Sequence, residues 1–193
     1  MSSPASWNFE IESPVAAPRL FRAALLDWHN LAPKFAPEIV VSATVIEGNG
    51  GVGSVRQFNF SSAMPFTYTK ERLDYVDHDK YESKQTLIEG GGIGVKLESA
   101  SSHIKFERAS NGGCVCKVVA TYKLLPGAAI DDEIAKAKDS ITKIIKTAEA
   151  ISSPTQMLMC NVSKIAAAAA AAAAASTILF EVCGHCYSKI SWN

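Results

Sequence analysis

The sequence predicts an α+β fold: a seven-stranded curved antiparallel sheet wrapped around a long C-terminal helix, with two short helices after the first strand and an internal cavity. Between residues 54 and 124, apolar and polar side chains alternate, and turn signals interrupt the alternation repeatedly. After Pro126-Gly127 the apolar period changes to that of a helix. A curved sheet and one amphipathic helix must bury their apolar faces against each other, which gives the order β-α-α-β6-α.

The N-terminal residues predict one strand followed by a pair of helices. Apolar and polar side chains alternate over Trp7–Glu12, which indicates a strand. The stretch Val15–Leu31 is apolar on a helical period, with Pro18 near its start. We expect Pro33 and Pro37 to stop it, because proline lacks the backbone N–H that a helix interior needs. Two short helices arranged in a V are the prediction.

The remaining strands are expected to form sequential hairpins, which pair antiparallel neighbours. Their turns carry Gly, Pro, Asn or Asp, residues that favour tight reversals. These turns are Met64-Pro65, Asp77-His78-Asp79, Gly90–Gly94 and Asn111-Gly112-Gly113. The expected strands are Ile39–Ile46, 54–60, Thr67–Asp77, Lys80–Glu89, Val95–Arg108 and Cys114–Leu124.

The segment Asp131–Ile151 predicts the long helix. Acidic side chains fill its first turn, where the helix dipole favours negative charge. Lysines lie on one face, and a stripe of apolar residues on the other is expected to pack on the sheet. The stripe consists of Ile134, Ile141, Ile144, Ile145, Ala148 and Ile151.

The chain divides into a domain over residues 1–151 and an atypical alanine-rich tail over residues 152–193. Pro154 should end the long helix. Ten consecutive alanines, Ala166–Ala175, favour a further helix over about 163–182, with partial disorder as the alternative.

The tail does not predict a membrane anchor or a metal site. Its uncharged stretch Ile165–Phe180 is shorter than the roughly 20 residues of a spanning helix. Cys183-Gly184-His185-Cys186 falls short of the four ligands of a structural zinc site. We expect no metal, no cofactor and no association with a membrane. We also expect a monomer, with weak self-association as the alternative because the altered end of the long helix would expose apolar surface.

The composition argues against nucleic acid as a partner. Nineteen basic residues balance nineteen acidic ones, and no basic stripe is visible. Residues 1–10 lack the pattern of a secretory signal, and the five cysteines do not suggest a disulfide framework. These features favour the cytoplasm, with the nucleus as a second location.

One ordered pattern runs through two of the expected strands and the turns beside them. It consists of Gly90, Ile93, Glu98, Ser101, Asn111-Gly112-Gly113-Cys114, Lys117 and Tyr122. At these spacings it resembles the Bet v 1 (birch pollen allergen) family, the class 10 pathogenesis-related plant proteins, over residues 1 to about 150. The resemblance implies the fold above, a hollow interior, and defence-related binding of amphipathic plant molecules such as hormones, flavonoids and steroids.

Strand parity places a set of side chains inside the expected cavity. Apolar walls with a few hydroxyl and amide groups suit a lipophilic ligand, and small residues such as Ser83 and Ser102 leave space. Arg56 on this face would need a carboxylate, water or a ligand anion. The predicted ligand-binding residues are Arg56, Phe58, Phe60, Tyr68, Tyr81, Ser83, Gln85, Ser102, Ile104, Cys116, Val118, Tyr122, Ile141 and Ile144.

A glycine-rich loop precedes this set. Its residues are Gly48, Gly50, Gly51 and Gly53. The spacing fits a dinucleotide fingerprint, but a strand follows it where that site needs a helix N-terminus. The loop resembles the family's own glycine-rich loop, and we expect it to be a tight structural turn. The alternative is that its backbone amides form an anion-binding nest.

The resemblance implies two alternative functions. For a ribonuclease, the resemblance implies Arg56, Glu98 and Glu149 as the catalytic residues. Arginine, however, cannot shuttle a proton, and by parity Glu98 faces away from the cavity. Abscisic acid receptors, a related group, inhibit a protein phosphatase. Residues 62–65 are similar to their proline-bearing gate loop, whereas Gly90–Lys96 lacks their His-Arg pair. We therefore expect no catalytic residues, and a phosphatase remains an alternative partner.

Overall fold

The computed structural model describes residues 3–152. The expectations for the tail, including the helix over 163–182 and the Cys183–Cys186 motif, lie outside the described residues. The elements in chain order are β1 (Ala5–Ser13), α1 (Ala17–Phe21), η1 (Arg22–Leu26), α2 (Trp28–Phe35), β2 (Val40–Glu47), β3 (Val55–Phe60), β4 (Tyr68–Asp77), β5 (Glu82–Gly90), β6 (Leu97–Arg108), β7 (Cys114–Leu124) and α3 (Asp131–Ser152).

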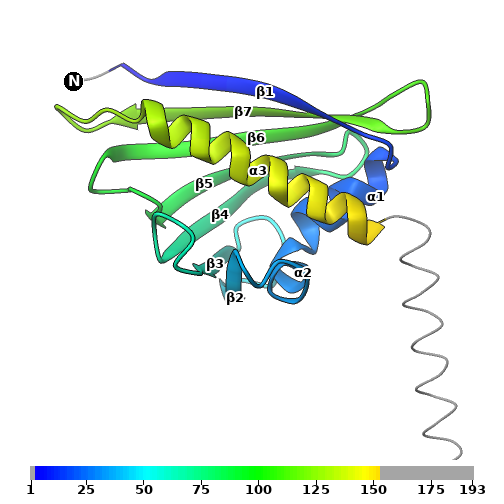
Figure 1. Cartoon of the computed structure of the whole chain (residues 1–193), viewed down its shortest axis with the longest axis horizontal. Helices are drawn as coiled ribbons and strands as arrows, with labels where there is room; N and C mark the ends of the chain where they lie inside the picture. Colours follow the sequence, from blue (N-terminus) through cyan, green and yellow to red (C-terminus); the bar gives the residue numbers. More distant parts are fainter. Residues whose placement is uncertain (1–2, 153–193) are drawn as a thin grey trace, which may run out of the picture. The chain divides into compact units, whose positions relative to one another are not determined.

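The strands form one antiparallel sheet in the order β1-β7-β6-β5-β4-β3-β2. β1 and β2 are therefore the two edges, and the helices α1 and α2 carry the chain from one edge to the other. The sheet curves around α3, which runs diagonally across its concave face (Figure 1). The predicted fold class, a seven-stranded sheet around a long C-terminal helix, is confirmed. Within the described residues, no helix has the length and apolar character needed to cross a membrane.

The tightest packing lies where α1 and the C-terminal half of α3 meet the sheet. Phe21 contacts Phe106 edge to face with ring centroids 6.1 Å apart, and both side chains are almost completely buried. Aromatic pairs in this geometry add to the free energy of apolar burial. The other side chains buried here include Leu20, Cys114, Cys116, Val118, Ile145 and Ala148. This end of the interior is a filled core.

Most element boundaries differ from the sequence-based expectation by one or two residues, and two of these differences have a clear local cause. Pro33 does not stop the second helix but lies inside α2, which ends at Phe35. A proline in a short helix removes only one backbone hydrogen bond, and Pro37 follows soon after the end. β5 begins at Glu82 rather than Lys80, because the Asp77 carboxylate accepts hydrogen bonds from the backbone N–H groups of residues 79 and 80 (3.0 and 2.9 Å) and holds them in the turn.

The helical segment after α1 is a π-helix, which the sequence did not predict. The N–H of Asp27 donates to the carbonyl of Arg22 at 2.8 Å. This acceptor is five residues before the donor, whereas in an α-helix it is four residues before. This wider turn connects α1 to α2. Such turns are rare and occur frequently at functional sites.

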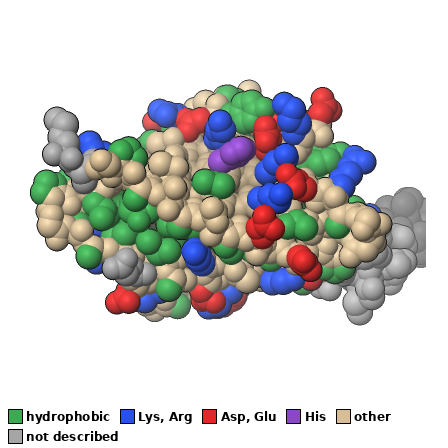
Figure 2. Space-filling view, turned by 90° about the horizontal axis from the view of Figure 1, so that it is seen from above, with side chains coloured by type: hydrophobic (Ala, Val, Ile, Leu, Met, Phe, Trp, Pro, Cys, Tyr) green, Lys and Arg blue, Asp and Glu red, His purple; other side chains and the backbone are tan. Residues whose placement is uncertain are grey.

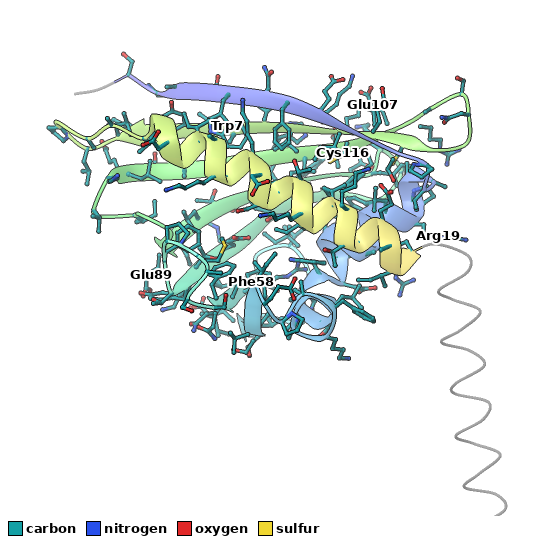
Figure 3. The ribbon with its side chains drawn as sticks, in the orientation of Figure 1. Trp7, Arg19, Phe58, Glu89, Glu107 and Cys116 are labelled. Atoms are coloured by element: carbon teal, nitrogen blue, oxygen red, sulfur yellow. The ribbon has the colours of Figure 1, made fainter. Side chains whose placement is uncertain are left out.

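The C-terminal end of α3 is tied to α1 by one side chain. Arg19 Nη1 donates to the backbone carbonyl of Ser152 at 3.2 Å, and Arg19 lies beside the last turn of α3 (Figure 3). A cation at this position satisfies one of the unpaired helix-end carbonyls and complements the helix dipole.

We expect Arg19→Ala to lower the free energy of unfolding by about 1 kcal/mol, because the bond to Ser152 is part-buried and charge-assisted. Chemical denaturation would measure the loss. Lys143→Ala is the matched control, since Lys143 pairs with Asp139 on the exposed face of α3 and should change stability by only about 0.3 kcal/mol. Equal losses in the two variants would show that Arg19 does not secure the helix end.

Candidate functional site

The concave face is filled at one end and open at the other, as the strand register shows row by row. The row Ser83, Ile104 and Val118 crosses β5, β6 and β7 and is fully buried. The next row, Gln85, Ser102 and Ala120, is only half-buried, and so is the row after it, Leu87, Ala100 and Tyr122. On α3, Ile145 is buried, whereas Ile141 and Ile144 are half-buried.

We call the two half-buried rows, with Ile141 and Ile144 opposite them, the open end. Its side chains keep accessible surface although they lie on the face that α3 covers. Small residues line much of it, since Ser102, Ala100 and Ala120 are adjacent across the strands. Figure 2 shows apolar side chains gathered at the left of the molecule, where Figure 1 places the connection between β7 and α3. The half-buried rows therefore lie toward the end of the sheet that carries this apolar surface.

The register brings most of the predicted ligand-binding residues to the concave face. Gln85, Ser102, Tyr122, Ile141 and Ile144 lie in the open end, and Phe60 is half-buried beside the core. The filled core contains Phe58, Ser83, Ile104, Cys116 and Val118. Burial raises the pKa of the Cys116 thiol to about 12, so Cys116 acts there as an apolar side chain.

The placement of Tyr68 on the concave face is wrong. Tyr68 pairs with Asn59 on β3, whose side chain is on the opposite face from Phe58 and Phe60. Its hydroxyl donates to Glu89 at 2.6 Å, and Lys70 contacts the same carboxylate at 2.6 Å. β4 begins at Tyr68, directly after an irregular loop, so the alternation of the preceding strand could not be extended to it.

Arg56 is buried on the concave face and is bonded to the protein backbone. Nη1 donates to the carbonyl of Leu25 in η1 at 2.7 Å, and Nη2 donates to the carbonyl of Gly50 at 3.0 Å. The guanidinium therefore ties the π-helix to the glycine-rich loop. Its Nε is buried with no hydrogen-bond partner among the described residues. The sequence predicted a ligand anion, a carboxylate or water as its partner, but backbone carbonyls fill most of that role.

Glu71 is the concave-face residue that the sequence analysis missed. It pairs directly with Arg56 across β3 and β4, so both side chains are on the same face. Burial raises the pKa of the Glu71 carboxyl, while a hydrogen bond from Thr69 (3.3 Å) and the charge of Arg56 act in the opposite direction. The side chain nevertheless keeps some accessible surface. Glu71 is therefore a partly accessible carboxyl beside Arg56 on the concave face.

Stability should respond to pH through Glu71. Because the folded-state pKa is raised, the fold disfavours the charged form, and this cost is absent below the ordinary carboxyl pKa and grows as pH rises above it. We expect Glu71→Gln to melt like the wild type near pH 4 and at a higher temperature near pH 7. Thermal melts across this range would test it. A difference that is constant with pH would contradict the raised pKa.

The glycine-rich loop between β2 and β3 is a tight structural turn. Gly48, Gly50 and Gly53 have φ values of 81°, 93° and 87°, which only glycine adopts readily. The N–H of Gly50 donates to Ser54 Oγ at 2.9 Å, and the N–H of Gly51 donates to Asn49 Oδ1 at 3.0 Å. Two of the amides expected for an anion-binding nest are therefore already bonded within the loop.

The residues that a ribonuclease would use are not gathered. Glu98 forms an ion pair with Lys123 at 2.7 Å and is exposed, at a register irregularity between Leu97 and Ser99 that breaks the alternation of β6. Glu149 pairs with Lys146 at 2.9 Å on α3. Arg56 is bonded to two backbone carbonyls elsewhere. The three side chains thus have separate partners.

The architecture places the chain among proteins in which a curved sheet grips a long helix, and comparisons with known proteins agree. The family model described as "Pathogenesis-related protein Bet v 1 family" matches residues 2–151. The chain belongs to this family. "Pathogenesis-related protein 1" of Asparagus officinalis is 53% identical over 156 residues, which is 79% of this chain and 98% of the relative. "Major pollen allergen Bet v 1-M/N" of Betula pendula is 42% identical over 60% of this chain and 74% of the allergen.

Solved structures show the same fold. The crystal structure of Ara h 8.0201 superposes with a TM-score of 0.69 at 29% identity, covering 78% of this chain and 98% of that one. A truncated norcoclaurine synthase from Thalictrum flavum superposes with a TM-score of 0.66 at 18% identity, covering 78% and 94%. At that identity the synthase shows shared architecture alone.

Proposed function

We propose that this protein is a defence-related protein of plants that binds amphipathic small molecules in the open end. The observation that carries the proposal is the contrast between register rows: Ser83, Ile104 and Val118 are fully buried, whereas the next row is half-buried. Apolar walls with a few polar groups are typical of ligand pockets. The names of the relatives, pathogenesis-related proteins and pollen allergens, support the defence setting.

The polar groups of the open end suit hydroxyl and carbonyl groups on an otherwise apolar ligand. The hydroxyl groups of Ser102 and Tyr122 and the amide of Gln85 lie there. Deeper in the interior, Glu71 and Arg56 are adjacent, and the raised pKa of Glu71 favours a carboxyl that donates a hydrogen bond. Flavonoids, steroids and plant hormones such as cytokinins or abscisic acid have the required mixture of rings and polar groups.

Fluorescence of the apolar probe ANS tests the proposal. We expect the wild type to bind ANS and plant flavonoids to displace it. Ala120→Trp should fill the open end and weaken ANS binding at least about tenfold, because the side chain lies between Ser102 and Trp7 in a half-buried row.

Val119→Trp is the matched control. Val119 is the preceding residue of β7, points to the convex face and is 41% exposed, so its replacement should leave ANS binding unchanged. If no probe binds the wild type and no small molecule raises its melting temperature, the proposal is wrong. Equal binding by a folded Ala120→Trp variant would place the ligand elsewhere and would also overturn it.

Separate assays test the two alternative functions, a ribonuclease and a receptor that binds a protein phosphatase. Ribonuclease activity would require RNA cleavage that Arg56→Ala and Glu98→Gln abolish, and the separation of these side chains argues against it. A receptor would bind a protein phosphatase only when ligand is present. We propose a binding protein without catalysis, so purified protein should show neither activity.

A further inference from the structure

A pocket that is largely open to solvent lies away from the open end, between the helices that follow β1 and the turn that joins β4 to β5. Its volume is about 420 Å³, within the range of small-molecule sites. Pro18, Phe21 and Leu26 form an apolar wall, and Arg22, Asp27, His78 and Tyr81 complete it. We call it the hairpin pocket. Of the ligand-binding residues predicted from sequence, only Tyr81 lines it.

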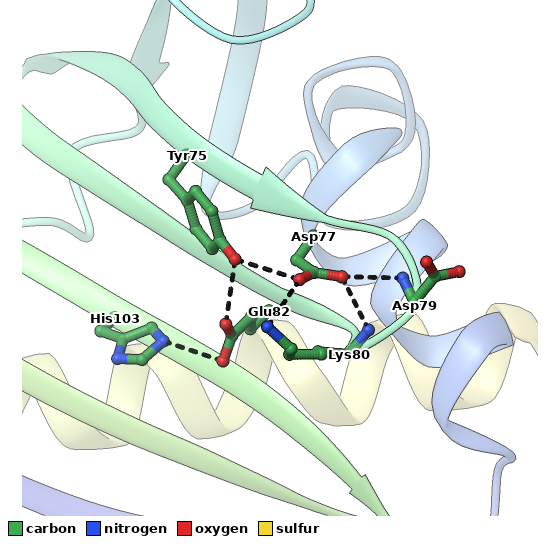
Figure 4. A network of polar contacts seen from close by, with 6 residues as sticks. All are labelled: Tyr75, Asp77, Asp79, Lys80, Glu82 and His103. Carbon is green, nitrogen blue, oxygen red and sulfur yellow. Dashed lines mark hydrogen bonds and ion pairs between the residues drawn. The ribbon is translucent and has the colours of Figure 1, made fainter.

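The aromatic walls of the hairpin pocket are held in place. The Phe21 ring contacts the ring of His78 edge to face at 6.2 Å and that of Tyr81 at 6.0 Å, measured between ring centroids. Phe21 is itself 2% exposed and anchored on the core. Two bonds from backbone N–H groups to Asp77 fix the turn that carries His78 (Figure 4). The rings of His78 and Tyr81 thus line the pocket and are both packed on the buried ring of Phe21, which limits the entropy cost of binding a planar ring.

Tyr81 has an unusual backbone conformation. Its φ is 53°, and among residues 3–152 no other non-glycine residue has a positive φ. A bulky side chain in this left-handed region is strained, and such strain concentrates at binding sites. Arg108 fixes the ring, since its Nη2 donates to the Tyr81 hydroxyl at 2.6 Å and its guanidinium carbon lies 5.4 Å from the ring centroid. The hydroxyl accepts that bond, so its own proton remains available to a ligand acceptor.

Charged groups at the hairpin pocket favour an anionic end on the ligand. Arg22 donates through Nε to Asp27 at 2.9 Å, and its side chain is 75% exposed. This bond uses one nitrogen, and the two terminal nitrogens of the guanidinium remain for a carboxylate, which arginine binds in bidentate geometry. Asp27 is already neutralised by Arg22, and Arg108 adds a further positive charge beside Tyr81.

We propose that the hairpin pocket is a second ligand site, for a planar aromatic carboxylate of one or two rings. Arg22 and the Tyr81 hydroxyl bind the carboxylate, and the rings of Phe21, His78 and Tyr81 surround the aromatic part. The assignment does not depend on the open end, because different residues line the two sites.

Titration of the full chain with 2-naphthoate, followed by NMR of the backbone amides, tests the assignment. We expect the amides of residues 22–27 and 78–81 to shift, and 2-naphthamide, which lacks the charge, to bind at least about tenfold more weakly. Arg22→Gln should weaken 2-naphthoate binding about tenfold and leave the melting temperature nearly unchanged, since the replaced ion pair is exposed and contributes little to folding.

The Ala120→Trp variant separates the two sites. It should keep 2-naphthoate binding at the hairpin pocket, with the amide shifts of residues 22–27 and 78–81 the same as in the wild type. Shifts confined to residues 100–102 and 120–122 would overturn the second site, and so would equal 2-naphthoate affinity in Arg22→Gln and the wild type. The absence of any shift at millimolar 2-naphthoate would overturn it as well, whatever the outcome with ANS.

Discussion

Gly90→Ala is expected to lower the free energy of unfolding by about 3 kcal/mol, which corresponds to a fall of roughly 10 °C in melting temperature for a domain of this size. Gly90 ends β5 with a φ of 72°, where alanine is disfavoured by about 1 kcal/mol. A Cβ at this position would also collide with the backbone carbonyl oxygen of Tyr68 on β4. Backbone cannot rotate away as a side chain can, so the two strands would have to separate.

Gly94→Ala separates the two causes. Gly94 lies in the same loop with a φ of 77°, but a Cβ there would meet no atom within 4 Å. We expect a loss of only about 1 kcal/mol, the cost of the left-handed backbone alone. Thermal and urea unfolding of both variants measure the difference. Equal losses would mean that the close approach of β4 and β5 at Gly90 is not what requires glycine.

Most of the fold could be predicted because it depends on patterns of period two and period 3.6. The strands β3 to β7 begin and end within a few residues of the predicted bounds, and the stripe on α3 that holds Ile145 and Ala148 faces the core. The π-helix η1 could not be predicted, since its bond from Asp27 to Arg22 depends on how α1 and α2 pack against the sheet. Pro33 shows the same limit: a local rule favoured a stop, and packing of α2 overrode it.

The candidate site was predictable only as far as parity extends. Parity placed Gln85, Ser102 and Tyr122 on the concave face, where the register has them. It failed for Tyr68, which follows an irregular loop, and it gave no reason to single out Glu71. The pairing of β4 with β5 has two irregularities, an extra residue in β5 opposite Lys70 and Glu71 and one in β4 between Leu73 and Tyr75, so a strict alternation along these strands misplaces side chains. Which end is open also depends on how α3 lies across the sheet, and no local pattern encodes that.

The buried pair of Arg56 and Glu71 leads to the other large expected effect. Arg56→Met should lower the free energy of unfolding by about 3–5 kcal/mol, because it removes two charge-assisted hydrogen bonds and leaves Glu71 without its nearby cation. The loss should depend on pH. Without Arg56, ionisation of the buried Glu71 is disfavoured further, so the loss grows as pH rises above the ordinary carboxyl range and is smallest near pH 4.

The double variant Arg56→Met/Glu71→Gln tests whether the two charges are coupled. If the Glu71 charge accounts for part of the loss, Glu71→Gln should stabilise the Arg56→Met variant at pH 7 by more than it stabilises the wild type, and the stability of the double variant should depend less on pH. The loss that remains would belong to the unpaired carbonyls of Leu25 and Gly50, which both variants share. Strict additivity of the two single changes at pH 7 would show that the guanidinium serves only to join η1 to the glycine-rich loop. Non-additivity would instead show that the charges of Arg56 and Glu71 interact directly on the concave face, where β3 and β4 pair them.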